Sequence, residues 1–273
     1  MLTTFIGGGN MAIALIGGMQ TRGHAAADFR VVEPLDPQRA RLSARFPGIG
    51  LFADCGAVAG STLVVFAVKP QQMHEAALAV APHLVASDAI VLTIAAGIRL
   101  ADLSRWLGGY SRLVRAMPNT PALIGKGISG VYAGPGVDAA GRALATGVLE
   151  AGGDVLWVDN EPMLDAVTGV SGSGPAYVFY FLEALEGAAR ELGFAPADAR
   201  RLAYATFGGS IALAQASAED PATLREQVTS KGGTTERALS SLEGDAVKAK
   251  IVAAVKAAAE RARELGDAFG KDA

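Results

Sequence analysis

The sequence predicts an α/β protein with a doubly wound sheet in its N-terminal part and an all-helical domain after it. Two observations predict this fold class. Apolar strand patterns alternate with helical patterns over residues 1–160, which is typical of a parallel sheet covered by helices on both faces. After Asp159 the strand patterns stop and helical spacing alone continues. We therefore expect one domain over residues 1–160 and a second over residues 161–273.

The composition is that of a globular protein able to bury a full core. Of the 273 residues, 51% are hydrophobic, and the net charge of −3 argues against non-specific binding to nucleic acid. Cys55 is the single cysteine, so no internal disulfide forms, which suits a reducing compartment. Met1 runs directly into a strand pattern without a leader, and no apolar run is long enough to span a bilayer. We expect a cytoplasmic protein with no membrane or nucleic-acid partner.

Short apolar runs define the strands of the first domain. Residues 63–68 form an unbroken run, which is typical of a parallel strand buried on both faces. The runs that we interpret as strands are residues 2–6, 29–32, 63–68, 89–94, 113–117, 128–132 and 155–158. The helical patterns between them begin at residue 13 and cover residues 38–46, 71–84 and 139–150.

A glycine-rich turn joins the first strand to the first helix. The stretch Gly7-Gly8-Gly9-Asn10-Met11-Ala12 has the spacing G-x-G-x-x-A of a dinucleotide-binding fingerprint. Gly7 makes the tight turn, Gly9 lets the backbone approach a pyrophosphate, and Ala12 allows the helix to lie close to the strand. A tight turn without a ligand is the alternative. Because the strand, turn and helix occur in the right order, the sequence favours a Rossmann-type dinucleotide site.

Other residues follow predicted strands at the edge where such a coenzyme binds. Glu33 ends the second strand, where an acid meets the hydroxyls of the adenosine ribose, although a solvated loop acid is the alternative. Lys69-Pro70 closes the strand at 63–68. Ala95 and Ala96 leave room for a ring system, and Asn119 lies in a rigid loop between two prolines.

The second domain consists of helical patterns rich in alanine and glycine. These residues allow very close packing between helices, and a small helical unit of this kind often completes its core by dimerisation. The predicted helices cover residues 163–170, 176–192, 197–217, 221–228 and 245–265, with a break at 171–175.

The loop at residues 228–235 combines hydroxyl groups with two adjacent glycines, and a helical pattern follows it. Glycines let successive N–H groups converge on one point, and a helix N-terminus behind them adds its positive dipole end. A small carboxylate is the natural ligand of such a nest, and an ordinary helix cap is the alternative. The residues that we predict to bind it are Ser230, Gly232, Gly233, Thr234 and Thr235.

The second domain lacks the usual proton donors for the reduction of a ketone. No lysine or histidine lies between Glu161 and Ser230. Lys231 is better interpreted as positive charge within the nest, and Tyr177 and Tyr180 are better interpreted as core residues than as donors. A protonated imine needs no donor, because its carbon is already electrophilic. Proximity and orientation then suffice, so the sequence favours reduction of C=N over C=O.

Five blocks of residues carry a resemblance to a known family. They are Gly7 to Ala12, Ala67 to Pro70, Arg115 to Pro121, Ser171 to Tyr177 and Val228 to Thr235. In this order they resemble pyrroline-5-carboxylate reductase over nearly the whole chain, and the last two blocks are specific to that family. The resemblance implies reduction of 1-pyrroline-5-carboxylate to L-proline by NADPH or NADH. It also implies homodimers built through the helical domain, sometimes assembled into decamers. We expect no metal site.

The resemblance also implies roles for single residues. Thr235 resembles the threonine that hydrogen-bonds the ring nitrogen of the substrate, and Ser230, Gly233 and Thr234 resemble the loop that binds its carboxylate. Asp54 lies where a coenzyme-contacting asparagine occurs in the family, and Glu33-Pro34 departs from the family's pattern. The coenzyme-binding residues that we predict are Gly7, Gly8, Gly9, Asn10, Met11, Ala12, Glu33, Asp54, Ala67, Val68, Lys69, Pro70, Ile94, Ala95, Ala96 and Asn119.

Two other functions fit parts of the pattern. A β-hydroxyacid dehydrogenase has a similar two-domain plan, but it uses a catalytic lysine in the helical domain, where none precedes Lys231. A non-catalytic regulator that binds a dinucleotide would not need the loop at 228–235. The choice between NADH and NADPH stays open at this stage, because Glu33 disfavours a 2′-phosphate whereas Arg39 and Arg41 lie close to it in the sequence.

Overall fold

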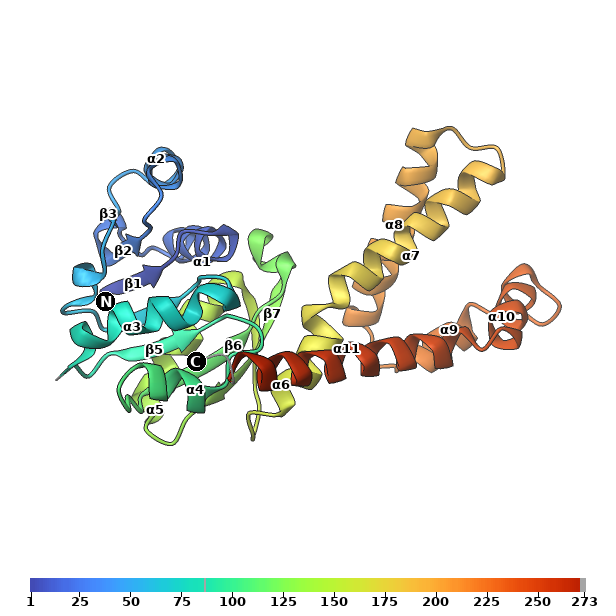
Figure 1. Ribbon diagram of the computed structural model, residues 1–273. Helices are drawn as coiled ribbons and strands as arrows, with labels where there is room; N and C mark the ends of the chain where they lie inside the picture. Colours follow the sequence, from blue (N-terminus) through green and yellow to red (C-terminus); the bar gives the residue numbers. More distant parts are fainter. Residues whose placement is uncertain (86, 271–273) are drawn as a thin grey trace. The chain divides into compact units, whose positions relative to one another are not determined.

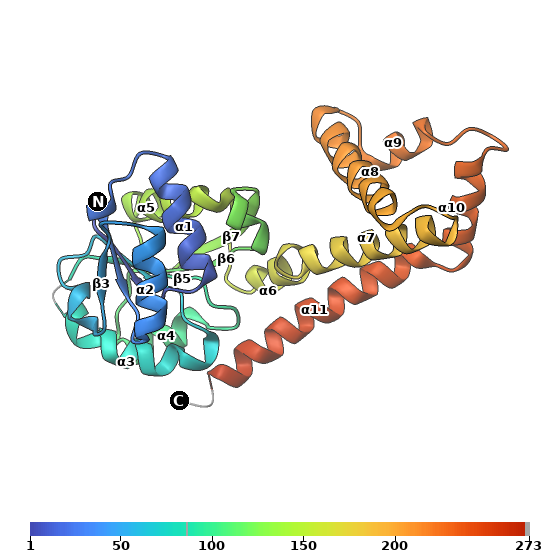
Figure 2. The same ribbon diagram turned by 90° about the horizontal axis from the view of Figure 1, so that it is seen from above.

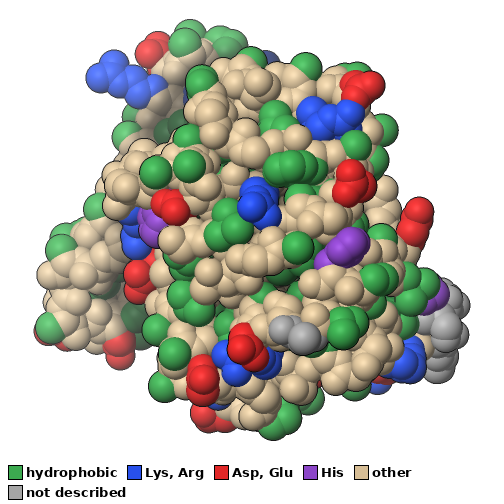
Figure 3. Space-filling view, turned by 90° about the vertical axis from the view of Figure 1, so that its left-hand side faces the viewer, with side chains coloured by type: hydrophobic (Ala, Val, Ile, Leu, Met, Phe, Trp, Pro, Cys, Tyr) green, Lys and Arg blue, Asp and Glu red, His purple; other side chains and the backbone are tan. Residues whose placement is uncertain are grey.

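The computed structural model describes residues 1–85 and 87–270, and it divides into two compact units. The first unit is Met1–Ser173 together with the end of the chain from Ala257, and the second unit is Gly174–Lys256. Within the described ranges, no helix is both long enough and apolar enough to cross a membrane. On the face of the first unit seen in Figure 3, basic and acidic side chains are interspersed.

An eight-stranded sheet forms the centre of the first unit, in the order β3-β2-β1-β4-β5-β6-β7-β8 (Figure 1). The first six strands are parallel, β7 is antiparallel to β6, and β8 is parallel to β7. The bounds are β1 Thr3–Ile6, β2 Phe29–Val32, β3 Gly50–Phe52, β4 Leu63–Phe66, β5 Ile90–Thr93, β6 Leu113–Met117, β7 Gly127–Ala133 and β8 Gly153–Trp157.

Helices cover both faces of this sheet (Figure 2). One hydrophobic core lies between the sheet and α1, α2 and α5, and a second core lies between the opposite face and α3 and α4. The predicted doubly wound fold is therefore confirmed. The bounds are α1 Asn10–Thr21, α2 Asp36–Arg45, α3 Met73–Leu84, α4 Leu100–Trp106 and α5 Ala139–Leu149.

The sequence missed two short elements and one strand direction. β3 has only three residues, and α4 has seven, so neither gives a periodic pattern of useful length. The antiparallel direction of β7 was not predicted, because an apolar run does not indicate which way a strand points. α2 begins at Asp36 rather than at residue 38, since Pro37 suits the first turn of a helix.

A buried cluster of ion pairs connects β6 to the chain that follows the sheet. Arg115 on β6 is only 3% exposed, and its guanidinium lies 2.9 Å from Glu161 and 3.5 Å from Asp165. Asp165 belongs to α6 (Met163–Val167) and also pairs with Arg99 at 2.8 Å. Glu161 accepts a further hydrogen bond of 2.9 Å from the backbone N–H of Leu100, at the start of α4.

The same cluster reaches the end of the last helix, α11 (Val247–Phe269). Arg99 lies 3.9 Å from Asp267 and donates a hydrogen bond to the carbonyl oxygen of Arg263. Gly266 packs directly on the Arg99 guanidinium, where an added Cβ would lie only 2.7 Å from Nε. The segments just before and just after the helical unit are thus both held on the first unit. The boundary at residue 160 between functional domains stays a prediction.

The second unit consists of helices that bury little of their apolar surface. α7 and α8 pack against each other, and the described side chains that are buried in α8 are Ala199 and Ala203. α7 has no buried residue, and Tyr180 on it is 70% exposed, so this tyrosine does not lie in a core formed by one chain alone. The helices are α7 Gly174–Glu191, α8 Pro196–Ala216, α9 Pro221–Gln227, α10 Thr234–Gly244 and the first part of α11.

Arg115→Ala is expected to lower the free energy of unfolding by about 3–5 kcal/mol, because it leaves Glu161 without its cation and Asp165 with Arg99 alone, next to the space that the buried guanidinium filled. Urea unfolding followed by circular dichroism measures this. Arg261→Ala is the control, since its pair with Glu264 is exposed and contributes at most about 1 kcal/mol. A loss below about 1 kcal/mol for Arg115→Ala would show that water already solvates the cluster.

Candidate coenzyme and substrate sites

The carboxyl ends of six parallel strands meet at one edge of the sheet, and the strand order reverses between β1 and β4. In open α/β sheets, ligands bind in the crevice at this switch point. Each group of predicted coenzyme residues follows one of these strands. The groups are Gly7 to Ala12 after β1, Glu33 after β2, Asp54 after β3, Ala67 to Pro70 after β4, Ile94 to Ala96 after β5 and Asn119 after β6.

The three glycines of the first turn differ in how much space the surrounding protein leaves for a side chain. Gly7 has φ +95°, and an added Cβ would lie 2.9 Å from a methyl group of Val68, so only glycine fits there. A Cβ on Gly8 would lie 2.4 Å from Leu42. A Cβ on Gly9 would meet its nearest neighbour, the carbonyl oxygen of Ala67, at 3.9 Å. Contacts within the protein therefore do not explain glycine at position 9, whereas the predicted close approach of a pyrophosphate would explain it.

The helix that follows this turn presents backbone donors to the same edge. Gly9 is the N-cap of α1, and the first intrahelical hydrogen bond runs from the N–H of Ile13 to the Gly9 carbonyl at 3.0 Å. The N–H groups of Asn10, Met11 and Ala12 precede that bond, where a helix leaves its donors without intrahelical partners. Such donors, together with the helix dipole, bind phosphate groups.

Glu33 is turned toward the glycine-rich turn and is only 8% exposed, so the alternative of a solvated loop acid is wrong. One carboxylate oxygen accepts the N–H of Gly8 at 3.1 Å, and the other accepts the N–H of Leu35 at 3.1 Å. Each oxygen keeps a lone pair that is able to accept a ribose hydroxyl. Gln38 on α2 donates from its amide to the carbonyl of Gly8 at 2.5 Å, a contact that no sequence motif indicates.

Asp54 and Asn119 already bond to the protein at this edge. Asp54 caps a short helix by accepting the N–H of Gly56 at 2.9 Å, and it is exposed. Burial, with a smaller contribution from the Asp54 charge, raises the pKa of the neighbouring Cys55 thiol. The Asn119 amide accepts the N–H of Ile128 at 3.0 Å and donates to the carbonyl of Ser171 at 3.2 Å. One N–H of the Asn119 amide remains for a coenzyme.

The Asn119 hydrogen bond joins two of the sequence blocks that carry the family resemblance. Ser171 lies in a π-helical turn, Thr168–Gly172, and such turns often occur at functional sites. Gly172 packs against Met117, where an added Cβ would lie 2.6 Å from the terminal methyl group. The loop after β6 and the turn before α7 therefore form one packed region within the first unit.

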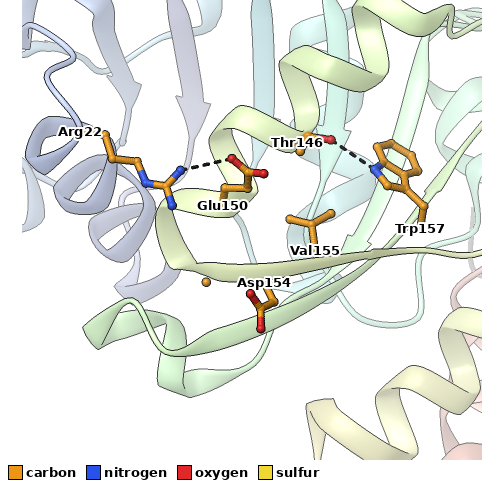
Figure 4. A pocket seen from close by; sticks show the side chains of 7 residues that line it. Arg22, Thr146, Glu150, Asp154, Val155 and Trp157 are labelled. Carbon is orange, nitrogen blue, oxygen red and sulfur yellow. Dashed lines mark hydrogen bonds and ion pairs between the residues drawn. The ribbon is translucent and has the colours of Figure 1, made fainter. Parts of the chain in front are cut away.

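A separate open pocket lies beside the edge strand β8 (Figure 4). Its volume is about 490 Å³, and an Arg22–Glu150 ion pair of 3.3 Å and a hydrogen bond of 3.2 Å from Trp157 to Thr146 lie along its wall. None of the predicted site residues lines it; the residues that do are Arg22, Thr146, Glu150, Gly153, Asp154, Val155 and Trp157. The coenzyme edge is therefore identified by the residues that follow the parallel strands and not by this pocket.

The loop before α10 has the features of an anion nest, but one of its donors is already used. Gly232 has φ +71°, and its N–H donates to the carboxylate of Glu236 at 2.6 Å. Gly233 is the N-cap of α10, so Thr234 and Thr235 are its first helical residues. Their N–H groups precede the first intrahelical bond, from Arg237 to Gly233 at 3.2 Å, and lie where an anion binds.

Within residues 1–85 and 87–270, no group of three or more histidines, cysteines, aspartates or glutamates is arranged to hold a metal ion. His24 lies 4.0 Å from Asp28, and the ring of His74 packs against Trp106 at 5.2 Å. Both histidines thus make local contacts in the first unit.

Two family models match the chain, one in each half. Residues 3–97 match a model described as NADP oxidoreductase, coenzyme F420-dependent, and residues 161–265 match a model described as pyrroline-5-carboxylate reductase dimerisation. A structure of Plasmodium falciparum pyrroline carboxylate reductase with NADP bound superposes with a TM-score of 0.86 at 25% identity, over 97% of this chain and 98% of that one. The fold and the coenzyme edge define an NAD(P)H-dependent oxidoreductase with a helical dimerisation domain.

Relatives that match over the full length identify the family. The chain is 43% identical to pyrroline-5-carboxylate reductase of Pseudomonas aeruginosa, over 98% of this chain and 97% of the relative. It is 36% identical to the Pisum sativum enzyme over 96% of this chain and 94% of the relative. The structure of the Coxiella burnetii enzyme superposes with a TM-score of 0.91 at 34% identity, over 96% and 97% of the two chains. The chain belongs to the pyrroline-5-carboxylate reductase family.

Gly9→Ala is expected to leave the fold intact and to weaken binding of the coenzyme. The added methyl group fits the protein but occupies the space predicted for the pyrophosphate, so the Kd for NADH should rise at least about tenfold, or about 1.4 kcal/mol. Fluorescence titration with NADH measures the Kd, and thermal unfolding checks the fold. An unchanged Kd in a folded variant would mean that the pyrophosphate does not approach Gly9.

Proposed function

We propose that this chain reduces the C=N bond of 1-pyrroline-5-carboxylate to L-proline, the last step of proline biosynthesis, with NADPH or NADH as hydride donor. The observation that carries the proposal is the presence of a glycine-rich dinucleotide turn at the switch point and a carboxylate-binding loop before α10 in one chain. The full-length similarity to pyrroline-5-carboxylate reductases supports the same conclusion. A β-hydroxyacid dehydrogenase would need a lysine that the helical domain lacks before Lys231.

In this proposal the domain at residues 1–160 binds the coenzyme. The turn from Gly7 to Ala12 holds the pyrophosphate through backbone N–H groups, and Glu33 accepts the hydroxyls of the adenosine ribose. Asp54 and the segments after β4, β5 and β6 line the rest of the edge. The small side chains of Ala95 and Ala96 leave space for the nicotinamide ring.

The domain at residues 161–273 binds the substrate. The backbone N–H groups of Thr234 and Thr235 and the hydroxyl of Ser230 hold the substrate carboxylate, and the Thr235 hydroxyl bonds the ring nitrogen. The carbonyl of Ser230 accepts the Gly233 N–H at 3.0 Å, which keeps this loop tightly folded at the start of α10.

The reaction needs little acid–base chemistry from the protein. A hydride moves from the dihydronicotinamide to the imine carbon, the C=N π electrons pass to the nitrogen, and the protonated imine becomes the secondary amine of proline. The oxidised coenzyme leaves as NADP⁺ or NAD⁺. Residues of the chain orient both molecules and exclude water, so catalysis rests on proximity and orientation.

The helical domain is proposed to form a homodimer, and dimers of this kind sometimes assemble further into decamers. α7 and α8 expose large apolar side chains that a monomer would leave in water, such as Phe179, Tyr180, Ile211 and Leu213. Burying such a surface against a second copy completes a core that the helices lack by themselves.

A cytoplasmic location is also proposed, because the single cysteine is unpaired, which suits a reducing compartment.

Thr235→Ala tests the proposed reaction. The parent protein should oxidise NADPH in step with the formation of proline from 1-pyrroline-5-carboxylate. Loss of one hydrogen bond to a charged group costs about 1.5–3 kcal/mol, so kcat/KM should fall roughly ten- to a hundredfold.

Thr235→Ser is the matched control, because it retains the hydroxyl and should keep most of the activity. Coenzyme oxidation without proline in the parent would rule out the reaction. An unchanged kcat/KM in a folded Thr235→Ala variant would rule out the role of Thr235 alone.

Ile211→Asp tests the proposed dimer. Ile211 is 58% exposed on α8, and a charge buried at an apolar interface without a partner strongly disfavours association. Sedimentation velocity should show a dimer or a larger assembly for the parent and a smaller species for the variant at micromolar concentration. A parent that sediments as a monomer would contradict the proposal.

A further inference from the structure

The segment from the end of β2 to α2 holds three charged side chains in a fixed arrangement. Glu33 is buried, and both of its carboxylate oxygens accept backbone N–H groups. Arg39 donates from one terminal nitrogen to the carbonyl oxygen of Glu33, and from the other to the carboxylate of Asp36. The Arg39 side chain is 22% exposed, whereas that of Asp36 is 88% exposed. The Arg39 guanidinium is thus held beside the backbone of Glu33 by the carboxylate of Asp36, which is exposed to solvent.

This arrangement decides how a 2′-phosphate on the adenosine ribose is received. In a Rossmann domain the acid at the end of β2 contacts the ribose 2′-hydroxyl, and an arginine nearby accommodates a 2′-phosphate. Because two hydrogen bonds fix Glu33, its carboxylate does not turn away from an incoming phosphate. The repulsion is relieved only if a cation faces the phosphate.

Arg39 is the cation that the fold places there. Its guanidinium contacts the backbone of Glu33 itself, so it lies at the carboxyl end of β2, where the adenosine ribose is expected. Arg30 is engaged elsewhere, since it donates to the carbonyl oxygens of Ala57 and Ala59 at 2.8 and 3.0 Å. Arginine binds a phosphate best through two parallel hydrogen bonds. One N–H on each terminal nitrogen of Arg39 already has an acceptor, and the Asp36 carboxylate also neutralises the guanidinium charge.

We propose that Asp36 is a specificity-determining residue of this enzyme, which limits the affinity for NADPH by holding Arg39 in an ion pair. The inference rests on the proposed coenzyme site, but not on the identity of the imine substrate. Asp36 makes no hydrogen bond to the glycine-rich turn, so its effect on NADH is small. Removing its carboxylate frees one terminal nitrogen of Arg39 while the other keeps the guanidinium beside Glu33.

The test measures the Kd values of NADPH and NADH directly by fluorescence titration, so that it does not depend on turnover. Asp36→Ala should lower the Kd for NADPH about three- to tenfold and change the Kd for NADH by less than about twofold. Arg39→Met alone should change the Kd for NADPH little, but in the Asp36→Ala background it should abolish the gain. Glu264→Ala removes a comparable i, i+3 partner from Arg261 on α11 and serves as the control.

Three results would overturn the proposal. An equal effect of Asp36→Ala on both coenzymes would mean that Asp36 acts through the stability of α2. A marked loss of NADPH affinity in Arg39→Met alone would mean that Arg39 already binds the phosphate. An unchanged Kd for NADPH in folded Asp36→Ala would mean that the freed guanidinium does not reach it. Coenzyme binding that follows the proposal without reduction of pyrroline-5-carboxylate would instead contradict the proposed function.

Discussion

The first unit depends on the pairing of Arg115, a charge buried on the interior strand β6. A cation at this depth is tolerated only when carboxylates and hydrogen bonds replace the water that it has lost. Glu161 and Asp165 supply those carboxylates, and both lie after the last strand of the sheet. The buried charge of Arg115 is therefore neutralised only when the chain that follows β8 has folded and formed α6.

A second constraint of the same kind shapes the coenzyme edge. Glu33 closes the gap between β2 and the glycine-rich turn through the N–H of Gly8, and Gln38 holds the carbonyl of the same glycine. Hydrogen bonds thus join the turn that is predicted to hold the pyrophosphate to the residue that is predicted to bind the ribose. Preorganisation of this kind lowers the entropy that binding must overcome, because the turn has its shape before a coenzyme arrives.

The sequence predicted the features that depend on local patterns, and it missed those that depend on distant partners. The glycine spacing at 7–12 and the buried run at 63–68 were sufficient to predict a doubly wound sheet, because both patterns reflect backbone geometry. The ion pairs of Arg99 and Arg115 were not predicted, because the acids lie far along the chain and only the fold brings them together. For Arg115 the two acids lie 46 and 50 residues away. Of the site residues, Gln38 and Glu236 were missed because their hydrogen bonds to glycine backbone leave no mark in a motif.

The contacts of Arg99 have a consequence for the topology of the chain. Asp165 precedes the helical unit and Asp267 follows it, yet both pair with this one guanidinium. In topological terms the second unit is an insertion into the first unit. The chain segments before and after the insertion both contact Arg99 of the first unit. Insertions with neighbouring ends are the ones that proteins exchange or lose without disturbing the host's core. A Rossmann domain that holds both ends of an insertion through one cluster of ion pairs is therefore able to accept a different helical module while its own sheet stays unchanged.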